Sequence, residues 1–307
     1  KLINDLYVNS VTFDFVEPLL RLRSQFHCCV HHMDLDLFLP GNILYIENNI
    51  LKTLNLTSRV TSAITRQGDF LSPHSFFQKN ITTVVMIDTR NFCIKTVNRK
   101  TNQTSILAGQ CNYHGYIDGP FSRARFGDIF GSVSLPGEKA YVMDQSGSSV
   151  RLLDFVSQRV STHLRLLYRL IGVAVRWSTR DLYFSYQGGI GKASLITRDI
   201  QYFTVDTYQR LNPYGHYFEN WVISMRFVTD NLLLIADQGK AIRVLDINNR
   251  STSEICSRPF SKFQVQAGNI SQCKVFEPQS FLVMPEENKI VVGFVSSIGY
   301  IDISGKL

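Results

Sequence analysis

The sequence predicts an all-β fold, a six-bladed β-propeller with four-stranded blades. Three observations lead to this prediction. Of the 307 residues, 21 are Phe and 13 are Tyr, and aromatic residues favour strands. A unit of short apolar strands separated by polar turns recurs along the chain. Helical hydrophobic periodicity is absent from every long window of the sequence.

The repeated unit is clearest at residues 84–109, where strands are expected at 84–87, 92–97 and 104–107. Equivalent apolar anchors recur 41 to 58 residues apart, at Tyr45, Met86, Val142, Tyr183, Leu233 and Val291. Four short strands at this period are the signature of a propeller blade. We therefore expect a single domain over residues 1–307, with blades at about 33–64, 83–109, 131–163, 171–205, 225–256 and 280–303.

The ends of the chain are expected to meet in the last blade. The sixth repeat stops at Ile303, after its third strand, and residues 6–15 alternate like a strand before the first blade. We predict that this N-terminal strand completes the last blade. Such a clasp resists opening, because unzipping it would expose two blade faces.

The net charge is +7, which suits an acidic partner. Charge alone does not choose among acidic proteins, glycosaminoglycans, anionic lipid headgroups and nucleic acid. We expect another extracellular or cell-surface protein as the partner, an anionic glycan as the alternative, and no nucleic acid. The most apolar stretch, residues 164–175, contains two arginines and is too short to span a membrane.

Five Asn-X-Ser/Thr sequons indicate a secreted protein or the extracellular face of a cell surface. Most lie in polar or turn-like stretches, as glycosylation sites do. The predicted glycosylation sites are Asn55, Asn80, Asn102, Asn249 and Asn269.

Six cysteines permit three disulfides, with 15 possible connectivities. Cys93 and Cys111 flank a predicted hairpin and are expected to pair. Cys256 ends a strand and Cys273 lies in the following loop, which makes a second local pair. Cys28 and Cys29 then form a vicinal disulfide or bond to a partner.

One junction resembles a known family. The segment Ile106-Leu-Ala-Gly109, then Gly115-Tyr-Ile-Asp-Gly119 and Ala124-Arg-Phe126, resembles the inter-blade segment of NHL-repeat propellers. The preceding residues 87–97 match the strand–turn–strand core of that family. The likeness touches most of the chain, although only this junction is specific.

The resemblance raises the question of catalysis, because NHL-like relatives include an amidating lyase that holds zinc through histidines. Calcium-dependent lactonases share the propeller architecture. In NHL repeats a histidine often follows the turn at the start of the third strand, whereas the matching positions here hold Ile50, Phe92, Ser149 and Ala241. We therefore expect no enzyme, no catalytic residue and no cofactor, with a structural calcium left open.

Several motifs allow both a structural and a metal-binding interpretation. Gly115 and Gly119 permit tight turns, and Asp118 is expected to bond local backbone amides. Asp88, Asp144 and Asp237 each end a strand, and bonding of turn amides is preferred over a ring of metal ligands. For the Cys- and His-rich residues 28–34, a disulfide role is preferred over a zinc or copper site.

Two long loops are the candidate partner-binding segments, because aromatic residues in loops are typical interface anchors. They span residues 65–82 and 206–224. The alternative is that their rings pack beneath their own loops. The candidate residues are Phe70, Phe76, Phe77, Tyr208, Tyr214, Tyr217, Phe218 and Trp221.

A basic run extends from Arg151 to Arg180. Strand alternation would scatter its arginines over both faces of a blade, although a contiguous anion site is an alternative. The residues are Arg151, Arg159, Arg165, Arg169, Arg176 and Arg180.

The function predicted from these patterns is an extracellular protein-recognition module with a receptor, adhesion or ligand role. It would be a glycosylated ectodomain or subunit at a cell surface. The alternatives are a secreted metal-dependent lyase or lactonase, and a module that binds glycosaminoglycan or lipid.

Overall fold

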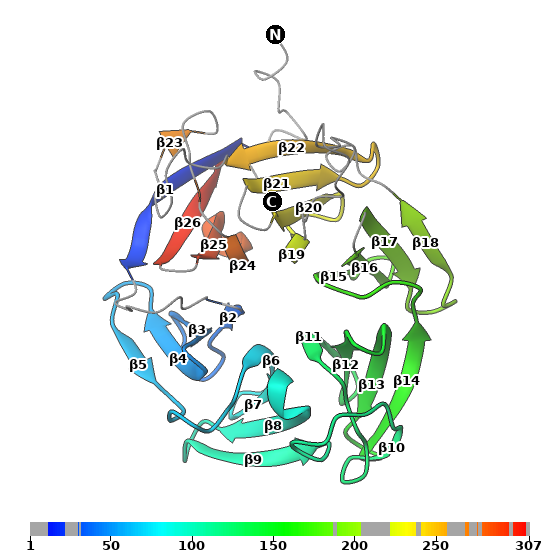
Figure 1. Cartoon of the computed structure of the whole chain (residues 1–307). Helices are drawn as coiled ribbons and strands as arrows, with labels where there is room; N and C mark the ends of the chain where they lie inside the picture. Colours follow the sequence, from blue (N-terminus) through cyan, green and yellow to red (C-terminus); the bar gives the residue numbers. More distant parts are fainter. Residues whose placement is uncertain are drawn as a thin grey trace, which may run out of the picture. The chain divides into compact units, whose positions relative to one another are not determined.

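The computed structural model describes residues 12–21, 30, 32–186, 189–203, 222–237, 241–256, 268–269, 275, 278–294 and 297–304. It is nearly all β, with six small antiparallel sheets arranged as a six-bladed β-propeller (Figure 1). The predicted fold class is therefore confirmed. No helix among the described residues is long and apolar enough to cross a membrane. The chain divides into two compact units: unit 1 is residues 1–30 with 172–307, and unit 2 is residues 31–171.

Unit 2 holds three sheets. The first contains β2 (Met33–Leu35), β3 (Asn42–Glu47), β4 (Ile50–Asn55) and β5 (Thr61–Ala63), and the second contains β6 (Pro73–Asn80), β7 (Thr83–Asp88), β8 (Cys93–Asn98) and β9 (Gln103–Ala108). A 3-10 helix, η1 (Thr89–Asn91), joins β7 to β8. The third sheet has the order β10 (Gly119–Pro120), β14 (Arg159–Arg165), β13 (Ser149–Asp154), β12 (Lys139–Asp144) and β11 (Ile129–Leu135).

Unit 1 also holds three sheets. One contains β15 (Val173–Arg176), β16 (Asp181–Tyr186), β17 (Gly189–Ser194) and β18 (Ile200–Phe203). The next contains β19 (Val222–Phe227), β20 (Leu232–Asp237), β21 (Ala241–Asp246) and β22 (Ser251–Cys256). The last has the order β23 (Gly268–Asn269), β1 (Thr12–Arg21), β26 (Ser297–Ser304), β25 (Lys289–Phe294) and β24 (Pro278–Met284), with η3 (Pro285–Glu287) between β24 and β25.

The N-terminal strand closes the last blade, as predicted. β1 pairs antiparallel with β26, from Thr12 opposite Ser304 to Arg21 opposite Ser297. The strand runs from residue 12 to residue 21, later than the predicted 6–15, and residues 1–11 lie outside the described part of the chain. A bulge between Val16 and Leu20 interrupts the pairing. The closing strand therefore begins six residues later in the sequence than the predicted strand.

The core of unit 2 lies between its sheets, because the middle strands are apolar on both faces. Phe76 belongs to the cluster between the first and second sheets, and Phe77 to the cluster between the second and third. Successive residues of a strand point to opposite faces, so β6 supplies both layers. The predicted loop 65–82 was therefore wrong over β6. Bulges near Pro73 and Gln78 disturb the alternation that would have indicated a strand.

Candidate functional site

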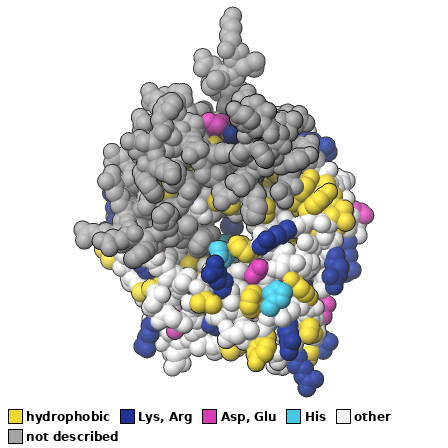
Figure 2. All heavy atoms as spheres, in the orientation of Figure 1, with side chains coloured by type: hydrophobic (Ala, Val, Ile, Leu, Met, Phe, Trp, Pro, Cys, Tyr) yellow, Lys and Arg dark blue, Asp and Glu magenta, His cyan; other side chains and the backbone are white. Residues whose placement is uncertain are grey.

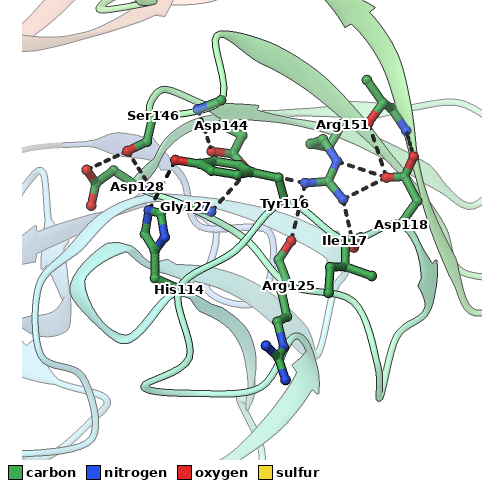
Figure 3. Close-up of polar contacts among 12 residues, drawn as sticks. His114, Tyr116, Ile117, Asp118, Arg125, Gly127, Asp128, Asp144, Ser146 and Arg151 are labelled. Atoms are coloured by element: carbon green, nitrogen blue, oxygen red, sulfur yellow. Dashed lines mark hydrogen bonds and ion pairs between the residues drawn. The ribbon is translucent and has the colours of Figure 1, made fainter.

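A dense polar cluster in unit 2 surrounds Arg151, whose side chain is only 1% exposed (Figure 3). Its Nε and Nη2 donate to Asp118 Oδ1 at 3.1 and 2.7 Å, and its Nη1 donates to Asp144 Oδ2 at 3.2 Å. Nη1 and Nη2 also donate to the carbonyls of Arg125 (3.3 Å) and Ile117 (3.0 Å). A guanidinium has five N–H donors, so every donor of Arg151 is used inside the protein.

Asp118 joins its loop to two strands that come much later in the chain. Its Oδ2 accepts the backbone N–H of Thr162 on β14 at 2.9 Å, while its Oδ1 accepts the bonds from Arg151. The prediction that Asp118 bonds local amides was wrong, because its partners lie 33 and 44 residues downstream. The structural interpretation of this loop is supported, although through distant partners.

Asp144 is completely buried at the end of β12. Besides Arg151, it accepts the backbone N–H groups of Gly127 (3.1 Å) and Gly147 (3.3 Å). Burial raises the pKa of Asp144, while these amides and the guanidinium act in the opposite direction. The carboxylate therefore connects the turn after β12 with the segment before β11.

Asp88 has the same role one blade earlier. Its Oδ1 accepts the N–H groups of Leu71 (2.9 Å) and Ser72 (3.2 Å), and Lys95 Nζ lies 2.8 Å from its Oδ2. The preferred interpretation, bonding of amides in the turn between the second and third strands, fits Asp144 through Gly147 and is wrong for Asp88, whose amide partners lie in the segment before β6. The side chain of Asp237 lies outside the described residues.

Within the described residues, no group of three or more His, Cys, Asp or Glu side chains could hold a metal ion. Asp88 pairs with Lys95, and Asp144 pairs with Arg151. Residues 28, 29 and 31 of the Cys- and His-rich run lie outside the described part, and the ring of His32 packs edge-on against Phe76. The contacts of Asp88 and Asp144 therefore support a structural role for these two carboxylates.

The ring of Tyr116 rests on two glycines. A Cβ atom added at Gly127 or Gly147 would lie 2.7 or 2.8 Å from this ring, so only glycine permits the approach. The Tyr116 hydroxyl lies 3.2 Å from His114 Nε2 (Figure 3), and the side chain remains 45% exposed. The buried cluster therefore supports an aromatic ring at the surface.

We define the β9–β10 surface as Phe92, Tyr113, His114, Tyr116 and Arg125. The His114 ring lies 5.1 Å from the rings of both Phe92 and Tyr116, and the Arg125 guanidinium lies 5.6 Å from the Tyr113 ring. Tyr113 is 60% exposed. Figure 3 shows the Arg125 side chain pointing away from Arg151 while its carbonyl faces it. The surface is thus aromatic and cationic.

The predicted aromatic anchors of residues 65–82 are not available to a partner. Phe70, Phe76 and Phe77 are 3%, 1% and 5% exposed. All three rings are buried in the core between the sheets, Phe70 and Phe76 in one cluster and Phe77 in the next, and not beneath a loop of their own. The anchors predicted in the second loop lie outside the described residues, namely Tyr208, Tyr214, Tyr217, Phe218 and Trp221.

Within unit 2, the arginines of the basic run differ in burial and position. Arg151 is buried and fully bonded, whereas Arg159 and Arg165 lie at opposite ends of β14. Arg176 is half-buried and donates to Asn231 at 3.0 Å. Figure 2 shows cationic, hydrophobic and histidine side chains mixed over the described part of the face it draws.

The Cys93–Cys111 disulfide is present, as predicted, with Cα atoms 5.0 Å apart. Cys256 is also disulfide-bonded, and its partner lies outside the described residues. Cys28, Cys29 and Cys273 lie outside them as well.

The sequons occupy turns and strand ends. Asn80, Asn102 and Asn249 are exposed, and Asn55 is half-buried. Asn269 lies in β23, and its side chain is not among those described. Sequence reasoning did not select the β9–β10 surface, because the Tyr116 ring packs against Gly127 and Gly147, and Gly147 is 31 residues away in sequence.

Comparison with known proteins gives a fold and no family. No family model and no curated protein matches the sequence. Among solved structures, the chain resembles a "putative gluconolactonase" with a TM-score of 0.65 and 11% identity, covering 96% of this chain and 99% of that one. A virginiamycin B lyase from Staphylococcus aureus gives 0.60 and 12%, with coverages of 95% and 99%. An auxiliary nutrient binding protein from Bacteroides thetaiotaomicron gives 0.68 and 10%, with coverages of 96% and 77%.

These neighbours correct the expectation that the chain is not an enzyme. Two of the three structures carry the names of enzymes, so the mismatched histidine positions do not set this chain apart from catalytic propellers. At 10–12% identity the likeness establishes the six-bladed fold, which serves both enzymes and binding proteins.

Proposed function

We propose that this chain is an extracellular recognition module of the NHL-repeat propeller kind, and that its β9–β10 surface binds an acidic segment of a partner protein. The observation that carries the proposal is a pair of exposed tyrosines on a buried, fully hydrogen-bonded frame. Tyr113 and Tyr116 are 60% and 45% exposed, and Arg125 lies beside Tyr113. Tyr and Arg are enriched among the residues that dominate interface energies.

The frame makes this surface rigid before a partner arrives. Arg151 holds two backbone carbonyls of the loop, and Tyr116 is packed against Gly127 and Gly147. The Cys93–Cys111 disulfide ties the start of the same segment to β8. A preordered surface loses less conformational entropy on binding, which favours affinity.

Charge supports an acidic partner. Arg125 lies beside the Tyr113 ring, and the chain carries a net charge of +7. The neighbouring carboxylates of Asp88 and Asp144 are buried and face cations, and the exposed carboxylates of Asp118 and Asp128 pair with Arg151 and Arg169, which reduces their effect at the surface. Such complementarity increases the rate of association and selects against basic partners. The disulfides support an oxidising, extracellular setting.

The test uses the fluorescent, tetramerised chain on intact cells. We expect trypsin treatment of the cells to abolish staining and heparinase treatment to leave it unchanged. The double variant Tyr113→Ser/Arg125→Gln should weaken staining by about tenfold or more. Its matched control is Val156→Ser, which changes a 77% exposed residue in the turn between β13 and β14.

Two results would overturn the proposal. Staining by the double variant at the level of the control would remove the β9–β10 surface as the binding site. Loss of staining after heparinase treatment would identify an anionic glycan as the ligand instead of a protein.

A second candidate is a propeller enzyme, favoured by the fold shared with the gluconolactonase and lyase structures. The secreted chain, purified without chelators, would be analysed for zinc and calcium and tested for hydrolysis of simple lactones. Stoichiometric metal together with saturable lactone turnover would support this candidate. Turnover without saturation, at the rate of buffer alone, would remove it.

A further inference from the structure

The sequons of unit 2 lie in turns at one end of the strands of its blades. In an antiparallel sheet of four consecutive strands, the first and third turns lie at one end of the strands, and the second turn lies at the other end. Asn80 ends β6 at a first turn, while Asn55 and Asn102 lie at third turns. All three therefore lie at the same end of the strands, and we call this end of the blades the sequon edge.

Ion pairs join the turns of this edge from blade to blade. Arg99, in a third turn, lies 2.7 Å from Asp36, in the first turn of the preceding blade. Lys79 beside Asn80 lies 2.9 Å from Glu138, in the first turn of the following blade. The sequon edge is therefore continuous across the three blades of unit 2.

The β9–β10 surface belongs to the opposite edge. The backbone N–H of Asn112 donates to the carbonyl of Asn91 in η1, which is a second turn. Tyr116 packs against Gly147, which lies in the second turn of the next blade. Six-residue strands separate the two edges by about 20 Å.

We propose that unit 2 carries N-linked glycans on the sequon edge and keeps the β9–β10 edge free of them. This division rests in part on the proposed function, because it assigns the bare edge to the partner. Asn80 and Asn102 are exposed, and the Asn80 Oδ1 accepts the N–H and hydroxyl of Thr82 within its own sequon. Asn55 is half-buried and donates its Nδ2 to Asn42 at 2.7 Å.

The side-chain contacts rank the three sites. Glycan attachment replaces one of the two hydrogens on the Asn amide nitrogen, so a glycan on Asn55 would have to leave from a half-buried side chain whose other N–H donates to Asn42. Asn80 and Asn102 are therefore the main glycan carriers, and Asn55 is occupied to a lower extent. In unit 1, Asn249 lies at the third turn of its own blade, as Asn55 and Asn102 do in theirs.

The first experiment is site-resolved glycopeptide mass spectrometry of the chain secreted from mammalian cells. We expect high occupancy at Asn80 and Asn102 and lower occupancy at Asn55. Unmodified Asn80 and Asn102 in the secreted, folded chain would overturn the proposal. This measurement requires no partner, so it tests the glycan edge independently of the proposed function.

The second experiment moves a glycan from one edge to the other. The variant Ser146→Asn creates the sequon Asn-Gly-Ser beside Tyr116, and Ser146→Gln is its matched control without a sequon. We expect glycosylated Ser146→Asn to lose cell staining by about tenfold or more, with recovery after enzymatic removal of the glycan. The variant Thr82→Val/Thr104→Val removes two native sequons and should stain within about twofold of the unchanged chain.

The outcomes separate the two proposals. Full staining by glycosylated Ser146→Asn, with Asn80 and Asn102 occupied, would remove the β9–β10 surface as the binding site and leave the glycan edge standing. Loss of staining by Thr82→Val/Thr104→Val, with an unchanged melting temperature, would place the partner or an essential glycan on the sequon edge and overturn the division.

Discussion

Two blades fill the same position with opposite chemistry. In the blade of β11–β14, the third residue of the third strand is Arg151, buried and bonded to Asp118 and Asp144. In the blade of β15–β18, the third residue of the third strand is Gly191, and the Phe184 ring lies directly over it. One blade therefore uses a paired charge where the other uses an aromatic ring on glycine.

The end of the second strand changes together with this position. Four blades have an acid there and a cation at the third residue of the third strand, namely Glu47 with Lys52, Asp88 with Lys95, Asp144 with Arg151, and Asp237 with Arg243. The other two have an aromatic residue and a glycine, namely Tyr186 with Gly191 and Phe294 with Gly299. The residues at these two positions thus vary together, and the ring that covers Gly191 belongs to Phe184, two residues before Tyr186.

The difference has consequences outside the blade. Asp88, Asp144 and Arg151 bond backbone groups of the segments that lead into their blades. Phe184 instead packs within its own sheet, edge-on to Tyr202 at 5.6 Å. A charged pair therefore fixes a loop, whereas the ring on glycine fills the core.

The largest expected effect comes from removing one partner of the buried ion pair between Arg151 and Asp144. Arg151→Met leaves the buried Asp144 without its cation and two loop carbonyls without donors. We expect a loss of about 3–5 kcal/mol in the free energy of unfolding, measured by urea titration. The matched control is Lys192→Met, whose cation is 30% exposed and 3.4 Å from Asp181, and which should cost about 1 kcal/mol or less.

The double variant Arg151→Met/Asp144→Leu sharpens this test. Removing both charges leaves no buried ion unpaired, since Asp118 is about half exposed to water, so the double variant should be more stable than Arg151→Met alone. A double variant that loses the sum of the two single effects would show that the pair acts as two independent packing residues.

The next largest effect is expected from the Cys93–Cys111 disulfide, which also holds the loop whose carbonyls Arg151 bonds. Replacing Cys93 and Cys111 by Ala removes a cross-link between residues 18 apart in sequence. We expect a loss of about 3 kcal/mol in the free energy of unfolding, because the unfolded chain gains conformational freedom. Urea titration of the secreted variant gives the value. An unchanged stability would assign the order of this loop to the Arg151 cluster alone.

The packing of the Phe184 ring on Gly191 can be disturbed by adding a side chain at the glycine. A Cβ atom added at Gly191 would overlap the Phe184 ring, which is fully buried and cannot move outward. We expect Gly191→Ala to cost about 1–3 kcal/mol in thermal or urea unfolding. Gly137→Ala is a control with a different cause, because its φ of +78° is strained for alanine although the space is open. In the double variant Gly191→Ala/Phe184→Leu, the smaller side chain should recover part of the loss.

The sequence predicted the features that depend on local pattern. The blade period follows from short strands that are apolar on both faces, and the Cys93–Cys111 disulfide follows from a local hairpin. β6 was missed because bulges near Pro73 and Gln78 disturb its alternation. The Arg151–Asp118 contact was missed because its partners are 33 residues apart and join a loop to a strand. The candidate surface depends on that contact, so it could not be read from spacing.

The smallest expected effect is the titration of Asp144. Burial raises its folded pKa above the unfolded value of about 4. The folded chain therefore binds this proton more tightly, and the contribution of Asp144 to stability decreases as pH rises from about 4 through the folded pKa. Asp144→Asn has no such titration. The difference in unfolding free energy between the unchanged chain and Asp144→Asn should therefore fall with pH over that interval and stay constant above it, as measured by urea titration at closely spaced pH values. A difference that rises with pH would mean that Arg151 and the two backbone amides outweigh burial, and that the charged pair stabilises this blade by attraction as well as by fixing its loop.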